Sequence, residues 1–140
     1  MSQNSRFISS DPNGSAIFKN GFSFLPPATY SDFAIVAAGT FDDLLDETLP
    51  VSEFAPQPSS NVYDWIIFSI GGLPGVDTGN GCVPGLGRFD TSSYALSTRE
   101  QIPPQLAIDR LVEIADFIGF DTSILLDVVQ EEGCVFPPLP

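Results

Sequence analysis

The chain has 140 residues, and its 18 acidic side chains outnumber five basic ones, so its formal net charge is −13. Such a balance excludes nucleic acid as a partner, because phosphate would be repelled. With no histidine and only two cysteines, the chain also lacks the usual general base of nucleophilic catalysis and the ligands of a zinc centre, and we expect no cofactor.

The N-terminal third of the chain is nearly neutral and rich in strand-forming residues. Residues 1–14 are polar and end in Asp-Pro-Asn-Gly, which predicts an N-terminal arm closed by a turn. Within residues 15–25, Asn20-Gly21 lies between two alternating apolar runs, the pattern of a β-hairpin. A β-branched and aromatic run near 30–38 predicts a further strand.

The middle of the chain predicts a short helix, a buried strand and a long loop. Thr40 is a candidate N-cap for a helix that carries the acidic cluster Asp42 to Glu47. The run near 62–70 is apolar and β-branched, as in a buried strand. Residues 71–87 follow, with seven glycines and two prolines. A loop of this length in a compact domain is usually functional or held by a partner.

The C-terminal third predicts a helical hairpin. Apolar residues recur with helical spacing over 104–118 and again over 122–132, and Gly119 separates the two runs. The Pro-rich tail, 134–140, cannot continue a helix and should be extended. The sequence therefore predicts an α+β fold: a single domain, 1–140, with a small antiparallel sheet, this helical hairpin, a long Gly/Pro-rich loop and extended termini.

The sequence contains no apolar run long enough for a transmembrane segment, and its first residues lack the apolar region of a signal peptide. We therefore expect a soluble protein in a virion or an intracellular assembly, with no membrane insertion. Cys82 and Cys134 lie far apart in sequence, and both a disulfide and two free thiols are compatible with this spacing.

Aspartates supply the remaining candidate chemistry. Asp77-Thr78-Gly79, after Val76, resembles the active-site triplet of aspartic proteases, which would imply a carboxylate that shares a proton with a second one. A Gly-rich turn closed by the Asp77 side chain explains the same residues. The loop carboxylates could instead wrap a calcium ion, and the acidic cluster 42–47 could be either a solvated face or a contact with a basic partner.

Aromatic and apolar residues in the arms and the long loop are the candidate partner contacts. They are Phe7, Phe18, Phe22, Phe24, Gly75, Val76, Leu86, Phe136 and Leu139. Our leading hypothesis is a non-catalytic structural or accessory component of a large assembly, a virus or phage particle above all, whose partners are other protein subunits, including copies of itself. The alternatives are an acidic inhibitor that mimics nucleic acid and blocks a basic groove, and a small aspartate-dependent enzyme.

Overall fold

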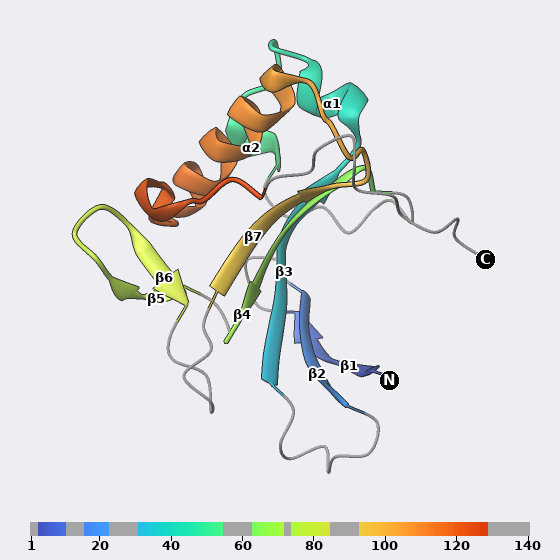
Figure 1. Ribbon diagram of the computed structural model, residues 1–140, viewed down its shortest axis with the longest axis vertical. Helices are drawn as coiled ribbons and strands as arrows, with labels where there is room; N and C mark the ends of the chain where they lie inside the picture. The colour runs from blue at the N-terminus through green and yellow to red at the C-terminus, as the bar shows by residue number, and fades with distance from the viewer. Residues whose placement is uncertain are drawn as a thin grey trace.

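A computed structural model describes residues 3–10, 16–22, 31–54, 63–71, 74–84 and 93–128. These residues form an α+β fold in which helix α2 lies across one face of a twisted antiparallel sheet (Figure 1). The strands are β1 (Gln3–Ser10), β2 (Ala16–Phe22), β3 (Ser31–Gly39), β4 (Trp65–Ile70), β5 (Pro74–Asp77), β6 (Cys82–Pro84) and β7 (Ser93–Thr98). The helices are α1 (Phe41–Leu45), α2 (Gln105–Ile118) and the short 3-10 helices η2 (Val51–Phe54) and η3 (Thr122–Ile124).

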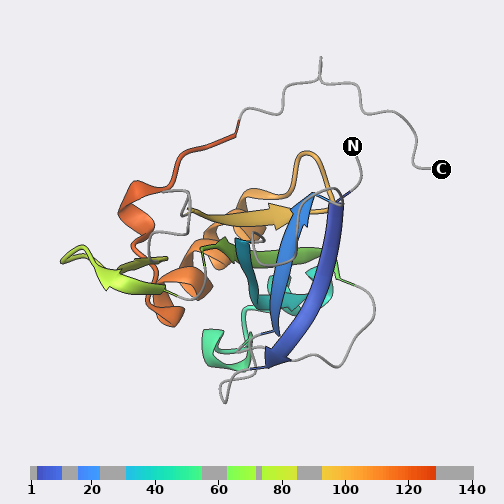
Figure 2. The same ribbon diagram turned by 90° about the horizontal axis from the view of Figure 1, so that it is seen from below.

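The main sheet has five strands in the order β1-β2-β3-β4-β7, and every neighbouring pair is antiparallel (Figure 2). The strands predicted near 30–38 and 62–70 are confirmed as β3 and β4. The predicted hairpin within 15–25 is wrong, because β2 runs without a turn through Asn20, whose partners are Ser5 on β1 and Ser31 on β3. Pairing on both edges satisfies the backbone of β2, and this outweighs the local turn preference of Asn-Gly.

The predicted N-terminal arm is in part a sheet strand. Residues 3–10 form β1, the edge strand beside β2, with a register shift between Phe7 and Ser9. A shift of this kind is a β-bulge, which bends the edge strand and interrupts its ladder of hydrogen bonds. Residues 3–10, which the sequence assigns to the arm, therefore belong to the sheet.

Helix α2 confirms the prediction for 104–118. Its buried side chains recur with helical spacing at Ala107, Leu111, Ile114 and Ala115, which places one apolar stripe against the sheet. Gly119 ends the helix in the left-handed conformation, with φ 104°, and its N–H returns to the last turn.

The second helix predicted over 122–132 is not formed in its described part. Only the single 3-10 turn η3 is present, and residues 125–128 are in no helix; residues 129–132 lie outside the described ranges, as does the predicted tail 134–140. The apolar residues in this stretch have helical spacing, but Leu126 and Val128 are 89% and 80% exposed. Most helical stability comes from packing an apolar face, and these two side chains find no such surface.

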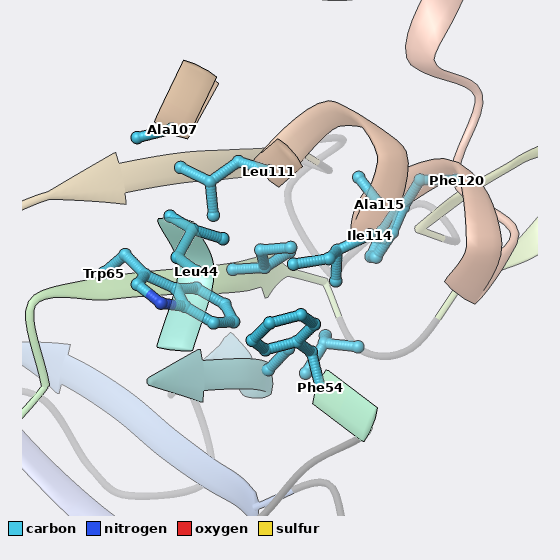
Figure 3. Packing of buried hydrophobic residues seen from close by; sticks show 11 residues of the cluster. Leu44, Phe54, Trp65, Ala107, Leu111, Ile114, Ala115 and Phe120 are labelled. Atoms are coloured by element: carbon cyan, nitrogen blue, oxygen red, sulfur yellow. The ribbon is translucent and has the colours of Figure 1, made fainter. Parts of the chain in front are cut away.

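The core lies between α2 and the sheet and is centred on Trp65 (Figure 3). The Trp65 side chain is 1% exposed, contacts Phe54 edge to face with ring centroids 5.9 Å apart, and donates its indole N–H to the Thr40 carbonyl at 3.0 Å. Gly39 makes room for the indole, because a Cβ at that position would lie 2.8 Å from the ring. A tryptophan with a satisfied N–H fixes β4 against α1 and η2.

Arg110 on α2 holds the α1–η2 connection in place. Its guanidinium donates to the carbonyls of Leu44 at 3.4 Å and Leu49 at 2.6 Å, and it lies 5.6 Å from the centre of the Phe54 ring. It also pairs with Glu113 at 3.0 Å. Thr40 caps α1 as predicted, since its hydroxyl accepts from the Asp43 N–H at 3.4 Å.

The long Gly/Pro-rich loop, 71–87, contains a second, two-stranded sheet. Strands β5 and β6 form a small hairpin with a register shift between Pro74 and Val76. In both views the hairpin lies beside the C-terminal end of α2 (Figures 1 and 2). Part of the segment that the sequence predicts as a loop is therefore a defined element with a fixed place next to the core.

Candidate protein-binding surface

The β5–β6 hairpin is attached to the end of α2 by its backbone. The Cys82 N–H donates to the Gly119 carbonyl at 2.7 Å, and the Asp121 N–H donates to the Cys82 carbonyl at 3.0 Å. These bonds make a parallel bridge between Cys82 and Phe120. The Phe120 ring in turn stacks on Tyr94 of β7 with centroids 4.4 Å apart, so the hairpin is connected through one buried aromatic residue to the main sheet.

The carboxylate of Asp121 holds the turn of the hairpin. Its Oδ2 accepts from the Thr78 hydroxyl at 2.5 Å, and its Oδ1 accepts from the Ser123 N–H at 3.1 Å and from the Ser123 hydroxyl. The Tyr94 hydroxyl donates to the Asp121 carbonyl at 2.5 Å. The Asp121 side chain therefore joins the turn after β5 to η3, and its backbone carbonyl joins the same point to β7.

The surroundings of Asp121 and Tyr94 shift the pKa of both groups in opposite directions. The bonds from Ser123 and then Thr78 lower the pKa of Asp121 below 3.8, so its carboxylate is ionised at neutral pH. Burial, and then the negative charge of Asp121, raise the pKa of Tyr94 above 10.0, so its hydroxyl keeps the proton that it donates. The low exposure of Asp121 comes from the Thr78 and Ser123 side chains that cover it.

Gly81 lets the hairpin approach the backbone this closely. Its φ of 152° lies in the region that only glycine adopts readily, and a Cβ there would lie 2.7 Å from the Asp121 nitrogen and 2.8 Å from the Phe120 carbonyl carbon. These neighbours are backbone atoms and cannot move away as a flexible side chain does. Gly79, in the same turn, has φ 89° but no atom within 4 Å of a Cβ.

Large apolar side chains are exposed on and after this attachment point. Leu126 and Val128 are 89% and 80% exposed, Phe117 on the last turn of α2 is 57% exposed, and Ile124 is 53% exposed. These four exposed large hydrophobic residues lie within twelve positions of one another. Such a group is more significant than a single exposed hydrophobic residue such as Ile102. We call these four residues the apolar exit surface, because they lie where the described chain leaves the core.

The exit segment offers backbone groups as well as side chains. Leu125 has φ −61° and ψ 135° and donates its N–H to Thr122, whereas residues 126–128 belong to no helix, strand or turn. An extended stretch with exposed apolar residues is the form in which a chain adds to the sheet or groove of a partner.

The predicted contact residues have several different placements. Phe7, Phe18 and Phe22 are in the sheet strands β1 and β2, and Gly75 and Val76 are exposed on β5, with Val76 at 48%. Outside the described residues are Phe24, Leu86, Phe136 and Leu139. The described structure brings Val76 near the end of α2, but it does not bring this set together into one surface.

Sequence reasoning missed the residues that build the attachment. Asp121 and Thr78 are 43 positions apart, and only the folded chain pairs them. Tyr94 and Phe120 were not distinguishable from ordinary core aromatics. A signal did exist for Leu126 and Val128, because the apolar residues on either side of Asp127 have to be either buried or offered to a partner.

The carboxylates that sequence analysis considered for chemistry make local structural bonds. The Asp77 Oδ1 accepts from the Gly79 N–H at 2.7 Å, which is the turn interpretation of that triplet. Asp46 accepts from the Thr48 hydroxyl at 2.6 Å and from its N–H at 2.9 Å, and the first of these bonds is the main reason why the Asp46 pKa is lowered.

Among the described residues, no three His, Cys, Asp or Glu side chains gather as they would around a metal ion, and no helix is long and apolar enough to cross a membrane. Cys82 carries a free thiol within this part of the chain, and Cys134 lies outside it. Whether the two cysteines pair under oxidising conditions stays a prediction.

No protein-family model, curated protein or solved structure matches the chain.

Proposed function

We propose that the protein is a non-catalytic accessory component of a large macromolecular assembly, a virus or phage particle in the first instance, and that it binds a neighbouring subunit through the apolar exit surface. The observation that carries the proposal is the exposure of Leu126 and Val128 on a segment that is neither helix nor strand and that follows the hydrogen-bonded Asp121. Burying a Val or Leu side chain contributes about 1.5–3 kcal/mol, so these two supply about 3–6 kcal/mol before the costs of association.

The rigid support favours binding over a free tail. The segment begins at Asp121, which Thr78 and Ser123 hold from two elements, so its first residues are ordered before a partner arrives. Ordering a chain in advance lowers the entropic cost of docking it.

Incorporation into the native assembly tests the proposal. The full chain with Leu126→Ser and Val128→Ser is compared with the full chain carrying Ile102→Ser, since Ile102 is 66% exposed but precedes the other end of α2. We expect the Ile102 variant to reach the purified particle at the wild-type ratio and the double variant to fall at least about tenfold below it, which is the effect of about 1.4 kcal/mol. Equal incorporation of both variants would contradict the proposal.

The acidic outer face of α2 supports a second candidate, an inhibitor of a protein with a basic groove. Asp109, Glu113 and Asp116 are exposed along this face, although Glu113 is paired with Arg110. An inhibitor of this kind would co-purify with one basic enzyme, and its affinity would fall steeply as salt is added. The apolar exit surface predicts a weak dependence on salt instead.

A further inference from the structure

We propose that strand β7 is a self-association edge, through which two copies of the chain pair antiparallel about a two-fold axis at Leu96. In the described part of the chain, β7 pairs only with β4 and forms the margin of the main sheet (Figure 1). The inference goes beyond the proposed function and does not rest on it, because the purified chain alone is sufficient to test it.

The register of β7 shows which of its backbone groups face outward. Trp65 pairs with Thr98, so the next pair is Asp64 and Arg99, and there the Arg99 N–H donates to the Asp64 carbonyl at 2.7 Å. In an antiparallel ladder, hydrogen-bonded pairs alternate with pairs that are not. The odd-numbered residues 93–99 therefore bond to β4, and the even-numbered residues 94–98 direct N–H and C=O away from the sheet.

The residues of β7 itself lack the features with which a strand protects an edge, although β6 lies in contact with part of the strand. Its six residues, Ser-Tyr-Ala-Leu-Ser-Thr, include no charge and no proline, and its register with β4 has no bulge. The opposite edge, β1, contains Arg6 and a bulge between Phe7 and Ser9. One edge resists strand addition and the other invites it, so β7 pairing with β7 gives a closed dimer rather than a filament.

A second copy fits this strand because the strand is complementary to itself. In this arrangement Leu96 lies opposite Leu96 of the second copy, and Tyr94 of each copy lies opposite Thr98 of the other. Each of these three pairs exchanges two backbone N–H to C=O bonds, which makes six hydrogen bonds about the axis. An aromatic side chain opposite a β-branched one is a favourable cross-strand pair. Leu96 already packs on the core, so two equivalents side by side join the two cores.

Charge argues for the same site. Each chain has a net charge of −13, so two copies repel least strongly where the surfaces that meet carry no charge. The six residues of β7 are such a neutral strip. Added salt screens the repulsion between the two bodies, so dimerisation through β7 should strengthen as ionic strength rises.

The test is sedimentation of the full chain at rising concentration, with Thr98→Pro compared with Thr98→Val. Both variants lose the hydroxyl that donates to the Glu100 carbonyl, but only proline removes the outward N–H, while the odd-numbered bonds to β4 remain. We expect a dimer for wild type and Thr98→Val, and a dissociation constant about 30-fold higher for Thr98→Pro. Proline removes one outward N–H from each of the two copies, so the dimer loses two hydrogen bonds, which are worth about 2 kcal/mol together.

Amide exchange in the unmodified chain keeps the proposal testable if Thr98→Pro fails to fold. In the dimer, the amides of Tyr94, Leu96 and Thr98 should exchange at least about tenfold more slowly at high than at low concentration, while those of Ala95 and Ser97 stay protected throughout. A monomer at every concentration, or even-numbered amides that exchange independently of concentration, would overturn the proposal. So would equal dimerisation of a folded Thr98→Pro and Thr98→Val.

Discussion

Gly81→Ala should release the β5–β6 hairpin from the core while the core stays folded. The new Cβ would lie 2.7–2.8 Å from backbone atoms of Phe120 and Asp121, and overpacking of this kind costs about 1–3 kcal/mol. The unfavourable φ adds about 1–3 kcal/mol. Detaching the hairpin instead breaks the two Cys82 backbone bonds, at about 0.5–1.5 kcal/mol each, and the Thr78 bond to the Asp121 carboxylate, at about 1.5–3 kcal/mol, so the clash and the strain together cost about as much as the attachment contributes.

The assay is amide hydrogen exchange followed by NMR, with Gly79→Ala as the matched control. Gly79 also has a positive φ but no neighbour within 4 Å of a Cβ, so its variant has the backbone strain without the clash. In Gly81→Ala the amides of Cys82 and Asp121 should exchange at least about tenfold faster, with Trp65 fluorescence unchanged. If the two variants exchange alike at these amides, the close approach at Gly81 does not hold the hairpin.

Three further outcomes follow from the contacts of α2 and Asp121. Ile114→Ala should lower the free energy of unfolding by about 2–5 kcal/mol in a urea titration, whereas Phe117→Ala should stay within about 0.5 kcal/mol, because Ile114 is 1% exposed and Phe117 is 57% exposed. Arg110→Met should destabilise by about 1–3 kcal/mol and Arg110→Lys by a similar amount, since neither reproduces the bonds to Leu44 and Leu49; a fully stable Lys variant would count against those bonds. The pKa of Asp121 is lowered in the folded protein, so the stability that its ionised carboxylate contributes is present above pH 3.8 and is lost as the pH falls through the lower folded pKa. Exchange of the Cys82 amide should therefore accelerate at that low pH in the wild type, and much less in Asp121→Asn.

Periodicity and capping made α1, α2, β3 and β4 readable from the sequence, whereas β1, β5, β6 and β7 are not among the predicted strands. The spacing of Ala107, Leu111 and Ile114 predicts α2, and Thr40 marks the start of α1, because both signals act within a few residues. The run around Trp65 predicts β4 for the same reason. In each of these elements the local conformational preference of the residues agrees with the structure that the whole chain adopts.

The errors came where distant residues decided the structure. Asn20-Gly21 favours a turn locally, but β1 and β3 bond both edges of β2 and extend it. Ile124, Leu125 and Val128 have helical spacing, but a helix over 122–132 needs a surface for its apolar face. The link between Thr78 and Asp121 spans 43 positions and depends on the approach at Gly81, and neither spacing nor composition encodes that approach.

The exit surface changes which part of the acidic chain we expect to bind. The described acids Asp109, Asp116 and Glu113 line the outer face of α2, and the uncharged side chains Phe117 and Leu126 lie at or beyond its C-terminal end. A charged body that remains in solvent and an apolar end that docks are consistent with an accessory subunit. The sheet edge at β7 would be a second, separate neutral contact.

Photo-cross-linking in the native assembly tests the central claim most directly. A photoreactive residue is placed at position 126, and in a parallel preparation at position 102, and the purified assembly is irradiated. The account predicts one abundant cross-linked neighbour from position 126 and none from position 102, although both side chains are exposed, at 89% and 66%. Equal labelling from both positions, or no neighbour at position 126 in an assembly that contains the protein, would contradict it.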